Sequence, residues 1–401
     1  MLDEIIKKSE EIRERLINFR REMHKCPELS GKEEKTAAFV AGVLEANGIE
    51  VRRNVGGHGV VGLLQSAAER PVFALRADMD ALPIQDQKEV DYASTVPGVM
   101  HACGHDVHTT ILMGTAIILG NMREALKGSV LFVFQPAEES INGAEAMIKE
   151  GVLDNPRPDA IVALHCLPEM EVGKVGVKGG MMTAAADMVS ITVKGRSGHA
   201  SRPHQTVDAV LVSSMVINAI HHIVSRRTNP LHPAVISIGT INGGRAENIV
   251  ADHVEMRGTV RTLDASLRKR IPTLIEDVVR GITSSMGATY EFDYKFECPA
   301  VMNDVKVNDF IKESMAEILG PENIVNLEEP MMGSEDFALF SEKVPGVLFR
   351  LGTANREKGI DAPLHNPRFD VDEESIIIGT RIMSLVAANY LSATNKVSEA
   401  K

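Results

Sequence analysis

A nine-residue stretch at positions 100–108 concentrates side chains that bind transition metals. It reads Met-His-Ala-Cys-Gly-His-Asp-Val-His, with three imidazoles, one thiol and one carboxylate. The whole chain has only 13 histidines and 4 cysteines, and four of these residues lie here. Cysteine thiolate and histidine nitrogen are the preferred ligands of zinc and its neighbours in the first transition row, so the stretch predicts part of a metal site rather than a polar loop with chance histidines.

Four further polar clusters follow segments that we predict to be buried strands. They are residues 76–80 after strand 72–75, residues 135–139 after strand 130–134, His165 after strand 160–164, and residues 364–367 in the loop after strand 346–351. In open α/β sheets, ligands bind outside the carboxyl ends of the strands. We therefore expect the fold to gather these clusters around the loop that contains Cys103 and His105.

The adjacent carboxylates Glu138 and Glu139 are the sharpest of these signals. Two neighbouring carboxylates in a loop repel each other unless a cation or a proton-transfer role uses them. Successive residues point in different directions, so one carboxylate can bind a metal while the other faces a water molecule. A solvated acidic pair is the alternative, but the strongly apolar strand directly before them favours a buried role.

Five side chains are candidate metal ligands: Cys103, His105, Glu139, His165 and His365. Five protein ligands exceed what one tetrahedral zinc ion needs, and they suit two metal ions that share a bridge and keep open positions. Such a pair polarises a carbonyl and lowers the pKa of bound water. Glu138 would take the proton from that water and pass it to a leaving amine.

The other polar residues of these clusters receive supporting roles. We expect His101 and His108 to orient or cap the loop, and Asp106 to support it. Cys166 follows a candidate ligand in a strand, so the alternation of side chains turns its thiol into the core.

Composition limits the class of protein. A chain of 401 residues is too long for one ordinary core, which predicts two domains or three. The net charge of -12 argues against nucleic acid or an anionic membrane as the main partner. The four cysteines are scattered, the first residues lack an apolar signal core, and no later stretch reads as long enough to span a bilayer. We therefore expect a cytoplasmic protein.

Helix-like and strand-like segments alternate over residues 1–182. An amphipathic helix is predicted near 3–24, and Ser30-Gly31-Lys32-Glu33 reads as a capping box that begins a second helix. Strands at 49–55, 59–64, 72–75, 130–134 and 160–164 are joined with helices at 107–122 and 144–149. This alternation predicts an α/β layer sandwich, and it resumes after about residue 300 with a helix at 308–319, a strand at 346–351 and a helix at 373–391.

Residues 183–297 follow a different order. Strand 187–193, helix 206–224, strands 234–240 and 254–263, helix 267–286 and strand 289–296 give the sequence β-α-β-β-α-β, which is the split βαβ or ferredoxin-like unit. We therefore predict a discontinuous α/β catalytic domain at 1–182 and 298–401, with an inserted α+β domain at 183–297.

The motifs of this chain resemble those of the aminoacylase/carboxypeptidase metallopeptidase family over essentially the full length. They are His101-Ala102-Cys103-Gly104-His105-Asp106, Pro136-Ala137-Glu138-Glu139, Ala163-Leu164-His165, Gly195-Arg196-Ser197-Gly198-His199-Ala200, Gly333-Ser334-Glu335-Asp336-Phe337 and Leu364-His365-Asn366-Pro367. The match is to the amidohydrolase branch, which includes hippurate hydrolases, N-acyl-amino-acid amidohydrolases, auxin-conjugate hydrolases and N-acetyldiaminopimelate deacetylases.

The resemblance implies an exopeptidase-like α/β/α catalytic domain with two metal ions and an inserted ferredoxin-like dimerisation domain. It implies Cys103 as the bridging ligand and Glu138 as the general base. The wider family takes its first ligands from a His-x-Asp motif, where this chain has Asp78-Met79-Asp80; Asp80 would then orient a ligand.

Three further assignments rest on the resemblance alone. His199 matches a histidine that reaches the reacting carbonyl, often across the dimer, and would stabilise an oxyanion. Asn248 and Arg261 match positions that hold the substrate carboxylate.

The expected function is metal-dependent hydrolysis of the amide bond of N-acyl-L-amino acids, with hippurate-like or N-acetyl substrates. A carboxypeptidase or dipeptidase that acts on short or N-blocked peptides with the same site is the alternative. A purely structural metal site is disfavoured, because it would need no spare base such as Glu138. We expect two divalent ions per subunit, zinc in the first place and manganese, cobalt or nickel as alternatives, in a homodimer or homotetramer.

Overall fold

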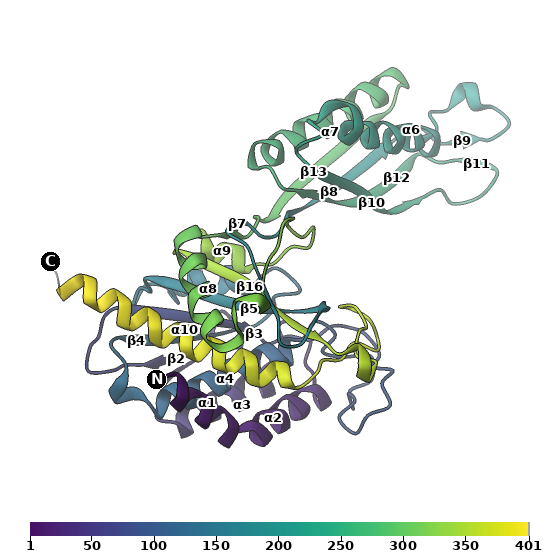
Figure 1. Ribbon diagram of the computed structural model, residues 1–401. Helices are drawn as coiled ribbons and strands as arrows, with labels where there is room; N and C mark the ends of the chain where they lie inside the picture. Colours follow the sequence, from purple (N-terminus) through teal and green to yellow (C-terminus); the bar gives the residue numbers. More distant parts are fainter. Residues whose placement is uncertain (400–401) are drawn as a thin grey trace. The chain divides into compact units, whose positions relative to one another are not determined.

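The computed structural model describes residues 1–399 of the chain. Its backbone contacts divide the chain into two compact units (Figure 1). The first unit comprises Met1–Met182, Val301–Glu329 and the chain from Asp336 onward. The second comprises Thr183–Ala300 and the short segment Pro330–Glu335.

An eight-stranded mixed sheet is the centre of the first unit. Its strands are β1 (Glu50–Val55), β2 (Gly59–Leu64), β3 (Val72–Asp78), β4 (Ser129–Gln135), β5 (Ala160–Glu171), β6 (Val175–Val177), β15 (Ile324–Asn326) and β16 (Gly346–Ala354). They lie in the order β1-β2-β4-β3-β5-β16-β6-β15, and the four middle strands β4, β3, β5 and β16 run parallel. β3, β4 and β16 are buried along their whole length, as expected for parallel strands covered on both faces.

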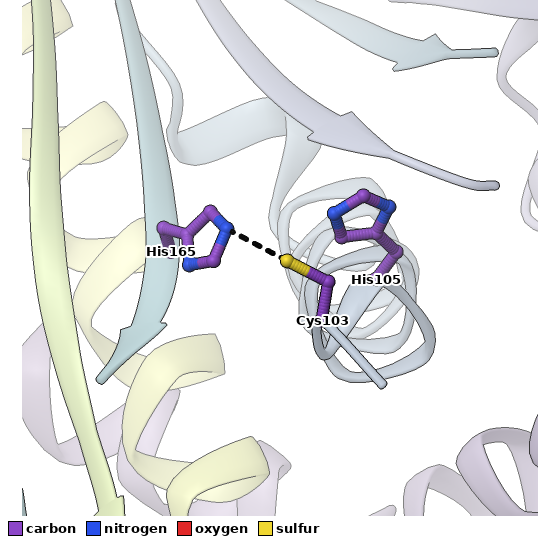
Figure 2. A group of neighbouring side chains, drawn as sticks. All are labelled: Cys103, His105 and His165. Atoms are coloured by element: carbon purple, nitrogen blue, oxygen red, sulfur yellow. Dashed lines mark hydrogen bonds between the residues drawn. The ribbon is translucent and has the colours of Figure 1, made fainter. Parts of the chain in front are cut away.

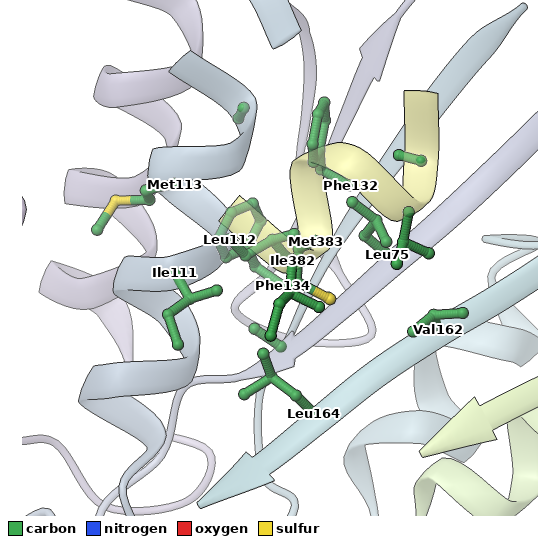
Figure 3. Packing of buried hydrophobic residues seen from close by; sticks show 14 of the residues in the cluster. Leu75, Ile111, Leu112, Met113, Phe132, Phe134, Val162, Leu164, Ile382 and Met383 are labelled. Atoms are coloured by element: carbon green, nitrogen blue, oxygen red, sulfur yellow. The ribbon is translucent and has the colours of Figure 1, made fainter. Parts of the chain in front are cut away.

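Within residues 1–399, eight α-helices belong to the first unit: α1 (Leu2–Glu11), α2 (Arg13–Lys25), α3 (Glu34–Ala46), α4 (His105–Gly120), α5 (Gly143–Lys149), α8 (Val305–Leu319), α9 (Phe337–Ser341) and α10 (Glu374–Glu399). Residues 105–119 of α4 are all buried, which marks it as a core helix. Figure 3 shows the apolar side chains of the sheet, such as Phe134 and Leu164, packed against Leu112 of α4 and Ile382 of α10. A short ribbon of β7 (Gly180–Met181) and β14 (Met302–Asn303) lies at the boundary of this unit.

Two local predictions for the N-terminal region are wrong. The predicted single helix near 3–24 is two helices, because the backbone leaves helical geometry at Ile12. The capping box does not form either: Glu33 is the residue at the N-cap position of α3, but neither its side chain nor that of Ser30 caps the helix. Glu28 takes that role, with its carboxylate accepting from the free backbone amides of Lys35 and Thr36. The side chains of Ser30 and Glu33 are directed elsewhere, as described below.

Two stretches pass a test of length and hydropathy for membrane spans, contrary to the expectation from the sequence. They are Ala209–Arg227 and Glu374–Thr394. The second is α10, of which 72% of the apolar window is buried, and a core helix of this kind passes the same test. Length and composition alone are therefore weak evidence for a membrane span here.

The second unit contains a four-stranded antiparallel sheet and two α-helices. The elements are β8 (Ala185–Lys194), α6 (Ala209–His222), β10 (Ala234–Gly243), β12 (His253–Thr262), α7 (Ala265–Ser285) and β13 (Thr289–Cys298), with the strands in the order β10-β12-β8-β13. Apolar side chains from the strands and both helices form one core, and the burial of β12 alternates along the strand. A ribbon of β9 (Gly198–His199) and β11 (Ile249–Val250) extends from the sheet. The order β-α-β-β-α-β confirms the predicted ferredoxin-like fold.

Candidate metal centre

Polar side chains at the ends of β3 and β4 and in the middle of β5 come together in the first unit. The sequence predicts that His165 follows a strand at 160–164, but β5 continues to Glu171 and contains it. Three of the donor groups there contain candidate ligands from different segments, and all members of each group lie within 4.8 Å of one another. The groups are Cys103, His105 and His165; Cys103, Glu139 and His365; and His105, Glu138 and Glu139. The structure thus gathers all five candidate ligands from distant parts of the chain, together with Glu138.

The loop before α4 depends on a glycine. Gly104 has a φ of +86°, in the left-handed region, and a Cβ atom at this position would lie 2.8 Å from Sγ of Cys166. This turn brings Cys103 and His105 to the same side of the helix, next to His165 of β5 (Figure 2). Sγ of Cys103 lies 3.4 Å from Nε2 of His165.

His105 has one engaged and one free nitrogen. Its Nδ1 lies 3.2 Å from Oδ1 of Asp80, which fixes the proton on that nitrogen. Its Nε2 is buried and has no hydrogen-bond partner within the described part of the chain. Oxygens of Asp78, Glu138 and Glu139 surround it at 3.8, 3.9 and 3.9 Å. These separations are too long for hydrogen bonds and leave room for a cation between the donors.

The ring of His165 is also oriented by a hydrogen bond at its Nδ1. Its Nδ1 donates to the backbone carbonyl of Cys166 at 2.9 Å, so the lone pair of Nε2 is directed toward Cys103. Burial, together with the charge of Arg350, lowers the pKa of His165 well below its usual value. The imidazole is therefore neutral, which is the form that binds metals.

The pKa shifts of Cys103 and His105 indicate that this cluster favours a bound cation. Burial and the nearby charge of Glu139 raise the pKa of the Cys103 thiol well above its usual value. Burial opposes a charged His105, yet Asp78 and other carboxylates raise the pKa of this imidazole to about 10. A cluster that disfavours a thiolate and favours an added positive charge fits divalent metal ions, which would balance both effects.

Two loops at the site contain strained backbone. Ala137, just before the two glutamates, has a φ of +54°, and His365 has a φ of +62°. Non-glycine residues rarely adopt such values, and they cluster at functional sites. The amide of His365 donates to the carbonyl of Ala102 at 2.8 Å, and its Nε2 lies 3.4 Å from Oε1 of Glu139.

The three candidate residues of the second unit do not all lie together. His199 and Asn248 are exposed at the β9–β11 ribbon, where the amide of Ala200 donates to the carbonyl of Asn248. Arg261 lies near the other end of β12, where it pairs with Ala186. It lies eight positions along the strand from His253 at the ribbon end, about 26 Å at about 3.3 Å per residue.

Ser30 and Glu33 are the contributors that the sequence interpretation missed. Ser30 Oγ donates to Oδ2 of Asp80 at 2.6 Å, and Oε1 of Glu33 accepts from the amide of Ala137 at 2.8 Å. Because their spacing matches a capping box, the sequence pattern indicated a role at the start of α3 and not these contacts. The signal that could have separated the two interpretations is Glu28, a second carboxylate able to cap the same helix.

Comparison with known proteins places the chain among hydrolases. Its sequence matches the family described as peptidase family M20/M25/M40 over residues 74–389. It is 44% identical to a probable hydrolase of Synechocystis sp., over 94% of this chain and 95% of that protein. It is 42% identical to an N-acyl-L-amino acid amidohydrolase of Geobacillus stearothermophilus, over 75% and 81% of the two chains. It is 38% identical to thermostable carboxypeptidase 2 of Saccharolobus solfataricus, over 95% and 96%.

A solved structure has the same fold. The YXEP protein of Bacillus subtilis, described as a dinuclear metal binding peptidase from the M20 family, superposes with a TM-score of 0.83 at 35% identity. The similarity covers 96% of this chain and 99% of that one.

Proposed function

The chain belongs to peptidase family M20/M25/M40, and from this premise we propose that it hydrolyses the amide bond of N-acyl-L-amino acids with two bound metal ions. The observation that carries the proposal is the cluster of five metal-binding side chains, of which Cys103, His105 and His165 are buried, with the buried carboxylate of Glu138 beside them. Relatives described as an N-acyl-L-amino acid amidohydrolase and as a carboxypeptidase support this class of substrate.

We assign the metal ligands to Cys103, His105, Glu139, His165 and His365. Cys103 is shared by two donor groups that together contain all five assigned ligands, one with His105 and His165 and the other with Glu139 and His365, which supports it as the bridge. The free Nε2 of His105 and the directed lone pair of His165 fit this assignment. When bound, two divalent ions would polarise the scissile carbonyl and lower the pKa of a water molecule. We propose zinc because of the thiolate, with manganese, cobalt and nickel as the alternatives that metal analysis would separate.

Glu138 is the proposed general base. It is buried, and its Oε2 lies 3.9 Å from the free nitrogen of His105. A carboxylate beside the ligands can accept a proton from the attacking water and donate it to the leaving amine. Asp80 holds the proton on Nδ1 of His105 and also accepts the amide of Glu139 at 3.0 Å, so it orients two ligands at once.

His199 is suited to stabilise an oxyanion. Its Nδ1 accepts from the backbone amide of Ser201 at 3.1 Å, so in the neutral ring the proton is on Nε2. That nitrogen is then a donor for the carbonyl oxygen on which negative charge develops.

Arg261 is proposed to bind the substrate carboxylate together with Asn248. The guanidinium is half-buried, and its contact is a hydrogen bond to Oγ of Ser334 at 2.7 Å. Among the described residues no carboxylate forms an ion pair with it. Its remaining N–H donors match the fork geometry of a carboxylate.

The separation of Arg261 from His199 and Asn248 favours a homodimer. A substrate of amino-acid size cannot bridge about 26 Å of strand, so a second copy would supply one side of the site. The second unit also has an exposed edge strand, β10, and exposed apolar side chains on α6: Val210, Leu211 and Met215. We therefore propose that residues 183–297 form the dimerisation domain and that residues 1–182 and 298–401 form the catalytic domain. Light scattering would give twice the mass of the chain.

The same site could act on peptides, and one experiment separates the two activities. Purified protein would be assayed with hippurate, N-acetyl-methionine, N-acetyldiaminopimelate and benzyloxycarbonyl-blocked dipeptides, before and after dialysis against a chelator. We expect hydrolysis of N-acyl amino acids that chelation abolishes and metal restores. Undiminished hydrolysis after verified metal removal would exclude the proposal, and preference for blocked dipeptides would favour a carboxypeptidase. All four cysteines are free, which is consistent with the proposed cytoplasmic location.

A further inference from the structure

Glu33 is a fully buried carboxylate outside the proposed catalytic groups. Its Oε1 accepts two backbone amides, that of Gly31 at 2.9 Å and that of Ala137 at 2.8 Å. Its Oε2 is buried without a hydrogen-bond partner within residues 1–399. A buried carboxylate is unfavourable without a compensating role, and the capping role at α3 belongs to Glu28.

Ala137 is the residue that directs the two glutamates. It follows β4 and precedes Glu138, and its φ of +54° is a conformation that alanine rarely adopts. Its carbonyl accepts from the amide of Gly143 at 3.2 Å, and its own amide donates to Glu33. The left-handed turn is therefore held from both sides, and the side-chain contact on its amide comes from Glu33.

The same N-terminal segment also contacts the second support of the site. Ser30 donates to Oδ2 of Asp80, the oxygen that also accepts the amide of Glu139. The other oxygen of Asp80 holds His105. The segment between α2 and α3 thus contacts both the turn before Glu138 and the carboxylate that orients His105.

We propose that Glu33 is a positioning residue for hydrolysis: it holds Ala137 in the left-handed conformation and so directs Glu138 and Glu139. The proposal rests on the proposed function in its assignment of Glu138 as the base. Glu33 acts through a backbone amide and as a hydrogen-bond acceptor. A side chain of the same shape that still accepts a hydrogen bond should therefore function in place of Glu33. A glycine at position 137, which adopts positive φ without strain, should make Glu33 unnecessary.

Four variants test this proposal. Glu33→Met keeps the volume but removes the acceptor, and we expect kcat to fall about tenfold, about 1.4 kcal/mol, while KM stays within about twofold. Glu33→Gln keeps an acceptor oxygen and should retain kcat close to that of the wild type. Ala137→Gly alone should change little, because glycine adopts positive φ without strain. The double variant Glu33→Met with Ala137→Gly should recover most of the lost kcat.

A second readout does not depend on activity. The free energy of unfolding in urea would be measured for the same four variants and the wild type, as a double-mutant cycle. We expect Glu33→Met to destabilise the wild type more than it destabilises the Ala137→Gly background. Metal content, measured by mass spectrometry, should remain near two ions in Glu33→Gln.

The outcomes are distinct. Equal loss of kcat in Glu33→Met and in the double variant, with additive free energies, would overturn the proposal, as would wild-type kcat in Glu33→Met. If Glu33→Met fails to fold, a folded double variant supports the proposal and an unfolded one opposes it. If the wild type hydrolyses no substrate in the panel, the proposed function fails, while the unfolding cycle still decides whether Glu33 holds Ala137.

Discussion

His108 donates from Nδ1 to Oδ1 of Asp78 across 2.6 Å, and this bond separates its role from that of His105 one turn earlier on α4. The other nitrogen of His108 accepts the backbone amide of Cys166 at 2.9 Å, so both of its nitrogens are engaged. His105 has a free Nε2 instead. Two imidazoles on the same face of one helix therefore differ in chemistry: one can bind a metal, and the other connects α4 to the end of β3 and the middle of β5.

The two neighbouring thiols provide a matched test of the metal assignment. We expect Cys103→Ala to lower the metal content below two ions per chain and to reduce kcat/KM by more than about 100-fold. Loss of a residue that only orients a metal ligand typically reduces activity by about 10–100-fold, so loss of a ligand itself should exceed that range. Cys166→Ala should keep both ions, because its buried thiol lies beneath Gly104 and its amide, not its sulfur, contacts His108. Metal analysis and steady-state kinetics on both variants check this, and equal metal loss in the two would contradict the assignment.

If Glu138 is the general base, its substitution should give a protein that binds metal but does not hydrolyse substrate. Glu138→Gln should lower kcat about 10²–10⁴-fold, because the amide cannot accept the proton of the attacking water. Its metal content should stay at two ions, since Glu138 is not an assigned ligand. Glu150→Gln, an exposed residue at the end of α5, is the control and should behave like the wild type. A Glu138→Gln protein within a few-fold of wild-type kcat would refute the role.

Much of the fold could be predicted, because local patterns and global structure agree. The runs at 72–75, 130–134 and 160–164 are apolar without interruption, and they are the parallel strands β3, β4 and β5. Since parallel strands end at one edge of the sheet, the residues after them had to meet there. That rule predicted that the residues at the ends of β3 and β4 lie close to His165, although β5 continues beyond His165 to Glu171.

The missed features are those that depend on direction and partner choice. Ser30 and Glu33 have the spacing of a capping box, but spacing does not show which acceptor a side chain reaches. The backbone of Ala137 is left-handed although alanine carries no sequence signal for it. Likewise, no proline or glycine lies at Ile12 to predict the break that divides the first helix. Tertiary contacts settle each of these details.

Recognition of the substrate carboxylate should depend on Arg261. We expect Arg261→Ala to raise KM for an N-acyl amino acid about 10–100-fold, equivalent to loss of a charged hydrogen bond, with a smaller effect on kcat. The KM for the corresponding carboxamide substrate should change little, because this substrate has no carboxylate for Arg261 to bind. Arg257→Ala is the control, because Arg257 lies on the same strand, is exposed and pairs with Glu255. Equal effects on carboxylate and carboxamide substrates would argue against this role.

Asp370 links a loop near the site to the N-terminal helices, and it predicts a pH dependence of stability. Its Oδ1 accepts from Arg20 at 2.8 Å and its Oδ2 from the hydroxyl of Tyr92 at 2.7 Å. Burial opposes ionisation, but Arg20 and Tyr92 outweigh it, so the pKa of Asp370 lies below its usual value. The ionised form therefore stabilises the fold at pH values above about 3.9, the unfolded pKa, and this contribution is lost as the pH falls through the folded pKa.

Asp370→Asn should consequently destabilise the protein by about 2 kcal/mol at pH 6, because Arg20 loses one charged acceptor but keeps Asp106. The difference in unfolding free energy between variant and wild type should shrink as the pH is lowered from 5 toward 3, since the wild-type carboxylate becomes protonated and loses its advantage. Urea unfolding at several pH values measures this difference directly. A difference that stays constant over that range would mean that Asp370 contributes through packing and neutral hydrogen bonds, and that its charge does not stabilise the fold.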